Sequence, residues 1–533
     1  MALTTALQAW RALLGDDAVL DADQANAAYG ADCGTVQRQV AGALRLTSAE
    51  LLPGLLRVAA AQGVALHALS TGRNWGYGSA LPSSDGCVLV DLSGLQRIHH
   101  FDAELGVVTV EPGVTQGMLA SFLSEGRHPF MVPTTGAGPD CSLIGNALER
   151  GYGITPHADH FGALTDIEAV LADGTHFRSA LREAAGEQLS RLFRWGIGPY
   201  TSGLFAQGSF GIVTRASILL ARRPARVECC LFSLRDDRLL EPAVAAVRQL
   251  LGALPGLVGG VNLMNQHRVL AMTAPYPVEH RGCAATLPPE LVAQMGRRYG
   301  IAPWTGFISL FGTRRTVAAA RHEIKRVLAR TASRMIFVGP EFAARLRTAA
   351  GWIPGAAGTR LSGSAQTLAS ALELAGGVPN RTALPLVYWR HAEGPAAMRQ
   401  RDPARDGCGL IWYAPLVPMR AGEVRDYVGM VKSVTVRHGI EPLVTLTSIS
   451  DKLFDSSVPL LFDRQLPGAM ARAQDCLQEL LETGRTAGFY PYRIGVDGMA
   501  QASAHFAEAA RVNERLAACF DPQRLLMPGR YAR

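Results

Sequence analysis

The feature that most constrains the fold is a set of three glycine-rich segments in the first 220 residues. Residues 70–79 read STGRNWGYGS and follow the apolar run VALHAL, residues 142–161 read SLIGNALERGYGITPHADHF, and residues 203–214 read GLFAQGSFGIVT. Glycine allows positive φ and close backbone approach, so such loops can turn several N–H groups toward one anion. A tight turn between two strands would use the same glycines. Each loop alone therefore leaves both interpretations open.

The composition is typical of a large folded protein. At 533 residues the chain is too long for one ordinary core, so two or three domains are expected. Hydrophobic residues make up 48% and charged residues 18%, which argues against disorder. The 52 basic and 45 acidic residues give a net charge of +7, and the basic excess is not gathered in runs. We expect no nucleic-acid partner, while an anionic ligand is compatible with this charge.

Cysteine usage and hydropathy predict a cytoplasmic chain with no membrane association. The nine cysteines are odd in number and include no CxxC pair, which favours reduced thiols over a disulfide framework or a zinc ribbon. The first residues, MALTTALQAWRALLGDD, lack the basic and long apolar regions of a secretory signal. No uncharged apolar segment approaches the roughly 18 residues of a membrane span.

Strand-like and helix-like segments alternate along the chain, which predicts an α+β or mixed α/β layout. Residues 47–63 carry a helix-start pattern, and residues 165–179 predict a hairpin that turns at Asp173-Gly174. Residues 208–224 predict a further strand pair. From about residue 226 a β-α-β-α order predicts a separate domain, and residues 351–410, rich in Gly, Ala, Pro and Arg, are expected to contain long loops.

Several common catalytic motifs are missing from the sequence. It contains no GxxxxGK[ST] loop, no strand-linked GxGxxG fingerprint, no GxSxG elbow and no HExxH. The sequence HADH (157–160) places two histidines three apart, but no further ligand cluster stands beside them. We therefore expect no metal, and the glycine-rich loops remain the leading feature.

Five segments, taken in order, resemble the vanillyl-alcohol oxidase and 4-cresol dehydrogenase family of flavoproteins. They are STGRNWGYGS (70–79), VEPGVT (110–115), GNALERGYGITP (145–156), GLFAQGSFGI (203–212) and MPGR (527–530). The match runs through almost the whole chain and is dense in the first 220 and last 50 residues. The resemblance implies a two-domain α+β fold, with residues 1–225 binding FAD, residues 226–475 forming an α/β cap, and residues 476–533 returning to the first domain.

The resemblance also implies which residues hold FAD. The 70–76 loop would wrap the diphosphate with its backbone N–H groups, the second segment would line the cofactor, and the third would approach the adenine. Arg530 would close the site. The implied cofactor-binding residues are Ser70, Thr71, Gly72, Arg73, Asn74, Trp75, Gly76, Ser142, Gly145, Asn146, Glu149, Arg150, Gly151, Gly153, Ile154, Gly208, Gly211, Ile212 and Arg530.

Three residues match the family's phenol-binding positions. Tyr77 lies inside the first loop, and Tyr492-Arg493 lie in GFYPYRIG. An arginine and two phenolic hydroxyls around one oxygen would hold a bound phenol as phenolate. A phenolate eases hydride loss from its para side-chain carbon to the flavin, giving a p-quinone methide that adds water or loses a proton. The alternative is an ordinary strand dipeptide whose arginine pairs with a surface carboxylate.

The sequence departs from the family pattern at several positions near the expected flavin. Ala137 stands where the oxidases carry an aspartate, with Asp140 three residues on, so a base at this point is in doubt. Ile154 replaces a tyrosine, and Asp455-Ser456 replace paired histidines. These changes predict an altered substrate.

The mode of FAD attachment is also open from the sequence. The resemblance puts Leu410 at the position of the attaching histidine and Val387 at that of the attaching tyrosine, with Tyr388 next to it. We expect non-covalent FAD, with Tyr388 as the candidate for a covalent link. Trp412 and Tyr413 are expected to line the substrate pocket, although aromatic residues in an apolar run also suit a core.

The sequence is compatible with three functions. The first is an FAD-dependent oxidase or dehydrogenase of a para-substituted phenol. The second acts on a non-phenolic alcohol, hydroxy acid or lactone, and the third is a flavin-binding protein without catalysis. The expected partners are a small aromatic substrate, O2 or a cytochrome c as electron acceptor, and further copies of the chain in a homodimer or higher oligomer.

Overall fold

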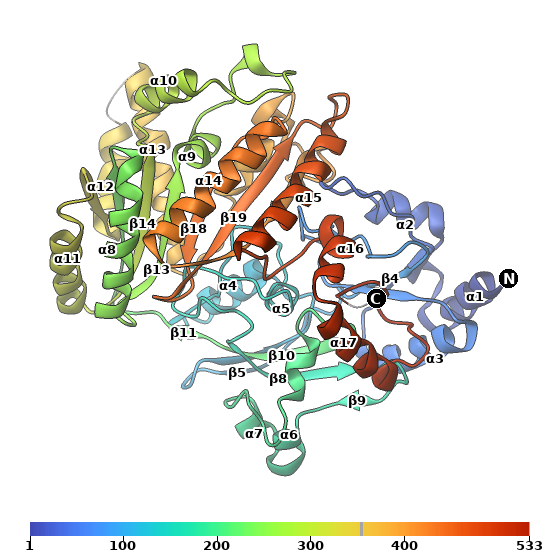
Figure 1. Cartoon of the computed structure of the whole chain (residues 1–533). Coiled ribbons are helices and arrows are strands. Elements are labelled where there is room, and N and C mark those ends of the chain that lie inside the picture. The colour runs from blue at the N-terminus through green and yellow to red at the C-terminus, as the bar shows by residue number, and fades with distance from the viewer. Residues whose placement is uncertain (352–354, 532–533) are drawn as a thin grey trace.

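The protein has a two-domain α+β fold, seen in a computed structural model that describes residues 1–351 and 355–531 (Figure 1). Residues before about 225 build a four-stranded, a five-stranded and a two-stranded sheet, and a larger sheet follows them in the chain. The strands of the first region are β1 (Val19–Leu20), β2 (Gly42–Arg45), β3 (Leu66–Leu69), β4 (Val88–Asp91), β5 (Ile98–Asp102), β6 (Val107–Val110), β7 (Phe130–Met131), β8 (Leu164–Val170), β9 (His176–Phe177), β10 (Ile212–Leu219) and β11 (Ala221–Arg222).

These strands form a four-stranded sheet of order β1-β2-β4-β3 and a five-stranded sheet of order β5-β6-β10-β8-β9. Strands β2, β4 and β3 are parallel, whereas the second sheet is antiparallel. The predicted hairpin of β8 and β9 is present. The strand pair expected over residues 208–224 is wrong, because β10 joins the five-stranded sheet while β11 pairs with β7.

Seven helices belong to this region. They are α1 (Ala2–Leu14), α2 (Ala22–Tyr29), α3 (Leu52–Gln62), α4 (Gln116–Glu125), α5 (Leu143–Leu148), α6 (Ala180–Ala185) and α7 (Glu187–Ser190). Helix α3 ends, as predicted, at Gly63 in the left-handed conformation. Thr115 and Ser142 cap α4 and α5 by accepting hydrogen bonds from backbone N–H groups in the first turn. Both caps lie beside the site described below.

The larger sheet has eight strands, in the order β15-β12-β14-β13-β18-β19-β16 with β17 paired to β19. Its strands are β12 (Arg226–Leu234), β13 (Val258–Asn265), β14 (Trp304–Gly312), β15 (Arg334–Val338), β16 (Gly409–Tyr413), β17 (Leu416–Pro418), β18 (Thr445–Ser448) and β19 (Leu453–Phe462). The helices that follow residue 225 are α8 (Leu240–Ala253), α9 (Gln266–Thr273), α10 (Pro289–Tyr299), α11 (Arg314–Leu328), α12 (Pro340–Gly351), α13 (Gly355–Ala375), α14 (Ala421–Arg437), α15 (Ala469–Ala487), α16 (Val496–His505) and α17 (Ala507–Phe520).

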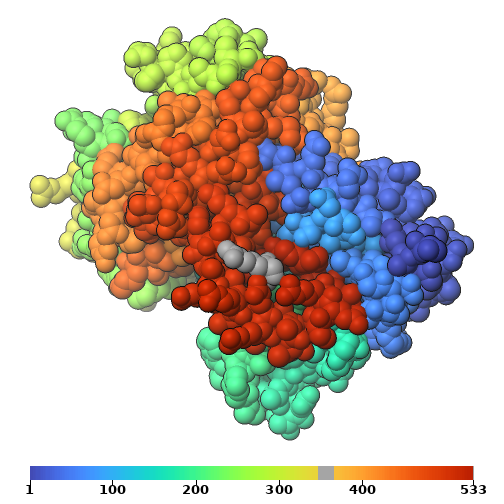
Figure 2. Space-filling view, turned by 45° about the vertical axis from the view of Figure 1, so that its right-hand side comes forward, coloured from blue at the N-terminus to red at the C-terminus, as the bar shows by residue number. Residues whose placement is uncertain are grey.

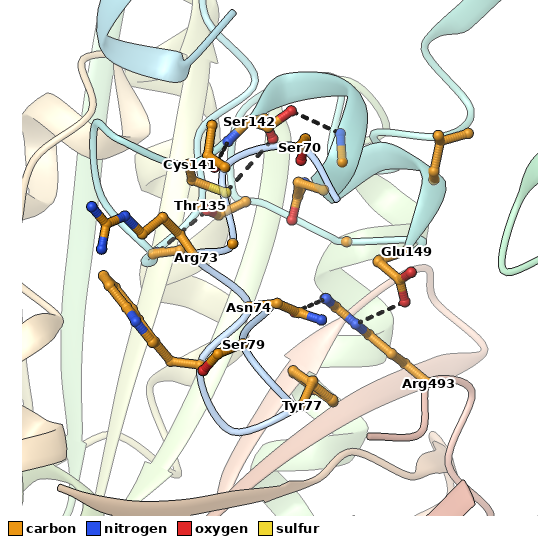
Figure 3. Close-up of a pocket in the computed structure, with 18 of the residues that line it drawn as sticks. Ser70, Arg73, Asn74, Tyr77, Ser79, Thr135, Cys141, Ser142, Glu149 and Arg493 are labelled. Carbon is orange, nitrogen blue, oxygen red and sulfur yellow. Dashed lines mark hydrogen bonds and ion pairs between the residues drawn. The ribbon is translucent and has the colours of Figure 1, made fainter. Parts of the chain in front are cut away.

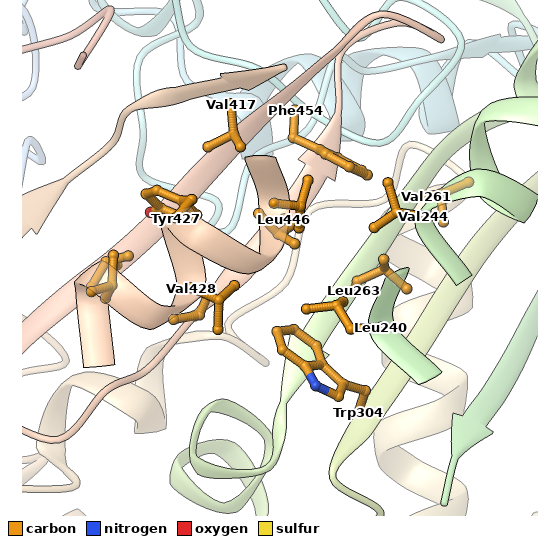
Figure 4. Packing of buried hydrophobic residues seen from close by; sticks show 14 of the residues in the cluster. Leu240, Val244, Val261, Leu263, Trp304, Val417, Tyr427, Val428, Leu446 and Phe454 are labelled. Atoms are coloured by element: carbon orange, nitrogen blue, oxygen red, sulfur yellow. The ribbon is translucent and has the colours of Figure 1, made fainter. Parts of the chain in front are cut away.

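The main core lies between one face of this sheet and helices α8, α11, α14 and α15 (Figure 4). Val244 and Tyr427 come from the helices, while Val261 and Phe454 come from the strands. Because side chains alternate along a strand, the neighbours of these strand residues point to the other face of the sheet. That second face closes part of the cavity described below.

Two expectations about this region are corrected, the first of them in part. The long loops expected within residues 351–410 are present over 376–408, where only two short 3-10 helices occur, but residues 355–375 form helix α13, since its alanine and leucine content favours a helix despite its glycines. Residues 352–354 of that segment lie outside the described residues. The expected boundary between residues 475 and 476 falls inside α15, which packs on the larger sheet through Cys476 and Leu480.

Residues after α15 cross back to the first region (Figure 2). Leu526 forms a bridge with Leu66 of β3, and the Leu66 N–H donates to the Leu525 carbonyl over 2.6 Å. We propose that the return to the first domain begins between α15 and α16. Among the helices of the described residues, none combines the length and the apolar character needed to cross a bilayer.

Candidate active site

A cavity of about 430 Å³ lies where the two regions of the fold meet. The first region contributes the 70–77 loop after β3, the start of α5 and the loop before β10. The larger sheet contributes residues of β16 and β19, and α9 adds one further residue. Segments far apart in the sequence therefore line one cavity.

The 70–77 loop presents unused backbone donors to this cavity. In the described part of the chain, no N–H group from Thr71 to Gly76 donates to another protein group. Thr71, Gly72 and Arg73 all line the cavity, and Gly72 has a φ of 64°. Free N–H groups in a glycine-containing loop fit an anionic group such as a diphosphate.

The same loop is also held in place by two residues that come much later in the sequence, Asp402 and Trp412. Arg73 forms an ion pair with Asp402, and the Trp75 Nε1–H donates to the same carboxylate over 3.0 Å. The Trp412 backbone N–H donates to the Gly76 carbonyl, and its Nε1–H donates to the Trp75 carbonyl, each over 3.1 Å. These contacts fix the position of the loop.

The second glycine-rich segment packs directly on the first. The Ser142 N–H donates to Thr71 Oγ1 over 3.3 Å, and Ser142 Oγ accepts from the Gly145 N–H over 2.9 Å (Figure 3). A Cβ atom at Gly145 would lie 2.2 Å from Ser70 Oγ. Glycine at this position therefore allows the two loops to approach each other.

Most residues that the sequence predicts to bind the cofactor line this cavity. They are Ser70, Thr71, Gly72, Arg73, Asn74, Trp75, Ser142, Gly145, Asn146, Glu149, Gly151, Gly208, Gly211, Ile212 and Arg530. Gly76 lies against Trp412 and Leu410, which line the cavity themselves.

Three predicted cofactor residues lie elsewhere. Arg150 is exposed, with a φ of 53°. Gly153 faces the Thr134 carbonyl, and Ile154 packs against Phe307 and its neighbours on the larger sheet. The fold moves the chain away from the cavity directly after Tyr152.

The structure places two tyrosines away from the cavity: Tyr413, which was predicted for the substrate pocket, and Tyr388, the candidate for a covalent flavin link. Tyr413 follows Trp412 on β16, so the alternation of side chains turns Trp412 into the cavity and Tyr413 into the main core. Tyr388 is fully buried in another cluster, where its hydroxyl donates to Asp406 over 2.7 Å. Val387, one position earlier, lines the cavity instead.

The three residues of the predicted phenol site, Tyr77, Tyr492 and Arg493, all line the cavity. The guanidinium of Arg493 lies 4.1 Å from the centre of the Tyr77 ring and donates to Asn74, with Nε 3.8 Å from Glu149 (Figure 3). Arg493 is therefore not paired with a surface carboxylate, the alternative considered from the sequence. Burial raises the pKa values of both tyrosines, so both hydroxyls keep their protons and can donate.

Asp455 adds a titratable carboxyl to this group. On β19, Phe454 and Ser456 face α14 and the core, so Asp455 and Ser457 face the cavity. The Tyr492 hydroxyl donates to Asp455 Oδ2 over 3.4 Å, and Oδ1 has no partner among the described residues. Burial raises the pKa of Asp455 to about 7, against the opposing effects of the Tyr492 hydrogen bond and the Arg493 charge. This carboxyl can take up or release a proton near neutral pH.

At position 137, where the oxidases of the family carry an aspartate, the cavity wall has no carboxyl group. Ala137 lines the cavity, whereas Asp140 is largely exposed and accepts a hydrogen bond from Arg381 over 2.7 Å. Asp140 therefore does not replace the missing aspartate.

Among the lining residues that were not predicted from the sequence, Tyr152, Gln207 and Arg268 bear most directly on the chemistry of the site. Tyr152 packs edge-on against Tyr492 with ring centres 5.6 Å apart, and the Gln207 amide donates to the Tyr492 carbonyl over 3.1 Å. Both residues stand beside glycines in the quoted segments, which was the available signal. Arg268, on α9, lies in a stretch without any motif.

Known proteins with sequences similar to this chain include flavoproteins, which is consistent with a cofactor-binding role for the cavity and its loops. Residues 40–180 match the FAD binding domain family. The chain is 33% identical to the 1'-carboxy-chondrochloren decarboxylase of Chondromyces crocatus over 531 residues, which cover 99% of this chain and 97% of that relative. It is 27% identical to the 4-cresol dehydrogenase [hydroxylating] flavoprotein subunit of Pseudomonas putida over 536 residues, covering 98% of this chain and 94% of the relative.

A solved structure of p-cresol methylhydroxylase with substrate bound has the same fold. Its TM-score is 0.88 at 24% identity, and the match covers 99% of this chain and 96% of that one. The fold and the site together define an FAD-dependent oxidoreductase. The chain belongs to the vanillyl-alcohol oxidase and 4-cresol dehydrogenase family of FAD-linked enzymes.

Proposed function

We propose that this enzyme removes a hydride from the para side-chain carbon of a phenolic substrate, either a 4-alkylphenol or a 4-hydroxybenzyl alcohol. The observation that carries the proposal is that Tyr77, Tyr492 and Arg493 line the same cavity as the glycine-rich loops. When bound, FAD supplies the redox chemistry by accepting the hydride. The protein's contribution is to hold the phenol and its charge.

The residues around the phenol site have different roles in removing the proton from the substrate phenol. Arg493 places a positive charge over the Tyr77 ring, and the two tyrosine hydroxyls can donate to a phenolate oxygen. Tyr492 passes a proton to Asp455 as it takes the proton of the substrate phenol, because its hydroxyl already donates to that carboxylate. Once Asp455 is protonated, both tyrosines stabilise the phenolate.

Loss of the hydride leaves a p-quinone methide in the pocket. Water can add to its side-chain carbon to give an alcohol, or the neighbouring carbon can lose a proton to give an alkene. The electron acceptor that restores the enzyme is proposed to be O2 or a cytochrome c, and a homodimer or higher oligomer is the proposed assembly.

The proposal predicts that para-alkylphenols will bleach the flavin absorbance on anaerobic mixing with the purified holoenzyme. Tyr492→Phe should slow bleaching by about 10- to 1000-fold, because the proton path to Asp455 is broken. Readmitting air then distinguishes an oxidase from a dehydrogenase by the rate at which the absorbance returns. Bleaching by a non-phenolic alcohol, hydroxy acid or lactone, with none by any phenol, would contradict the proposal and favour the second function.

A second candidate is oxidative decarboxylation, favoured by the 33% identity with a decarboxylase over almost the full chain. In a substrate with a carboxylate on the carbon next to the oxidised one, hydride loss would give the same p-quinone methide. The electron pair of the C–COO⁻ bond would then form the alkene and restore the phenolate, with release of CO2. Detection of one CO2 per flavin reduced distinguishes this reaction from simple dehydrogenation.

We also propose that FAD is bound without a covalent link. Tyr388 lies outside the cavity with its hydroxyl on Asp406, and Val387 and Leu410, which line the cavity, carry no nucleophile. Acid precipitation of the holoenzyme should therefore release the flavin into the supernatant. Tyr388→Phe should leave that result unchanged. Yellow, protein-bound flavin in the washed pellet would show a covalent link.

A further inference from the structure

Arg268 lines the cavity as a cation that has no acidic partner among the described residues. It lies in the first turn of α9, where the Asn265 side chain caps the helix by accepting from the Arg268 backbone N–H over 3.0 Å. Its guanidinium lines the cavity and lies 5.7 Å from the centre of the Trp412 ring. The side-chain atoms Nε and Nη1 are buried and have no hydrogen-bond partner among the described residues.

The other arginines that line the cavity each lie close to a carboxylate of the described residues, whereas Arg268 does not. Arg73 pairs with Asp402, and Arg493 and Arg530 both lie beside Glu149. No carboxylate of the described residues forms an ion pair with Arg268. Burying a charge without a partner of opposite charge destabilises a protein, so a bound anion would supply the negative charge that the described residues do not place beside Arg268. Burial lowers the pKa of Arg268 to about 10, which leaves the side chain charged at neutral pH.

Trp412 connects Arg268 to the proposed phenol site. Its ring is stacked with that of Tyr77, with centres 6.5 Å apart and planes 19° apart, and it also lies next to the Arg268 guanidinium. A substrate whose phenol oxygen is held at Tyr77 and whose body lies along Trp412 therefore extends toward Arg268. The cation lies at the side-chain end of such a substrate.

From this arrangement, and resting on the proposed function, we infer that Arg268 binds a carboxylate carried by the para side chain of the substrate. The substrate class is then a 4-hydroxyphenyl alkanoate or a larger molecule that ends in that group. Such a substrate is compatible both with dehydrogenation of the side chain and with the decarboxylation described above.

The test compares an acid with its neutral amide. Anaerobic rapid mixing of the holoenzyme with 3-(4-hydroxyphenyl)propanoate, its amide, and 4-ethylphenol gives the dissociation constant of each from the concentration dependence of flavin bleaching. The acid should bind about 10- to 100-fold more tightly than the amide, the range of a charge-assisted hydrogen bond. Arg268→Gln should abolish that preference while 4-ethylphenol still bleaches the flavin, and Arg268→Lys should restore part of it.

A matched control is Arg238→Gln, which removes an exposed arginine paired with Asp236 on the surface and should keep the preference. Equal affinity for acid and amide in the wild type, an unchanged preference in Arg268→Gln, or loss of FAD from that variant would each overturn the inference. Failure of the proposed function has a different signature, since 4-ethylphenol would then bleach neither the wild type nor any variant.

Discussion

Asp455→Asn is expected to lower kcat/KM for a para-alkylphenol by about 10²- to 10⁴-fold, the usual contribution of a general base. The amide cannot take the proton that Tyr492 would pass on, although it preserves the size of the side chain. Rapid-mixing and steady-state kinetics on the variant, with its FAD content measured first, check this result.

The pH dependence of kcat/KM provides a second test of Asp455 as the proton acceptor. The pKa of Asp455 is raised from 3.8 to about 7, so the carboxylate required as proton acceptor disappears as the pH falls through 7. Wild-type kcat/KM should therefore rise with pH through that value, and the rise should be absent in Asp455→Asn. Asp451→Asn, which changes a surface carboxylate beside Lys452 near the same strand, should keep both rate and profile. A full rate with an unchanged profile in Asp455→Asn would assign the proton to another group.

Gly76→Ala is expected to abolish stable FAD binding. Gly76 has a φ of 77°, and a Cβ there would lie 2.6 Å from Trp412 Cδ1 and 2.8 Å from Leu410 Cγ. The substitution therefore adds backbone strain and also displaces the Trp412 indole, which holds the loop through the Trp75 carbonyl. The ratio of flavin to protein absorbance after gel filtration measures the loss.

Gly86→Ala is the matched control for this variant. Gly86 has the same φ of 77°, but a Cβ there would meet nothing within 4 Å. It should cost only the left-handed backbone strain, about 1–2 kcal/mol, and retain FAD. Equal flavin content and equal Tm in the two variants would show that the Trp412 contact yields without consequence.

The glycine-rich loops could be predicted because their chemistry is local. A run such as residues 70–75 carries its conformational freedom and its free N–H groups within the sequence itself, and the structure places those residues on the cavity. Tyr413 could also have been excluded, since a strand that points Trp412 toward a ligand must point its neighbour away.

Other parts of the site depend on tertiary packing that no local pattern encodes. Ile154 follows a predicted cofactor segment, yet the chain turns after Tyr152 and packs it on the larger sheet. Arg268 lies in a stretch without any motif, and its significance comes from the tertiary structure, in which no carboxylate of residues 1–351 and 355–531 forms an ion pair with it. The role of Asp455 likewise follows from its face of β19 and its burial, which its residue type alone does not indicate.

The bridge between Leu66 and Leu526 has a consequence for how the enzyme is made. The ribosome produces β3 and its loop first, whereas residues 525–530, which attach to β3 and bring Arg530 to Glu149, are added much later. A nascent chain can fold its early sheets, but it lacks one wall of the cavity until those late residues arrive. Capture of the cofactor is thereby deferred until residues 525–530 have been added to the chain.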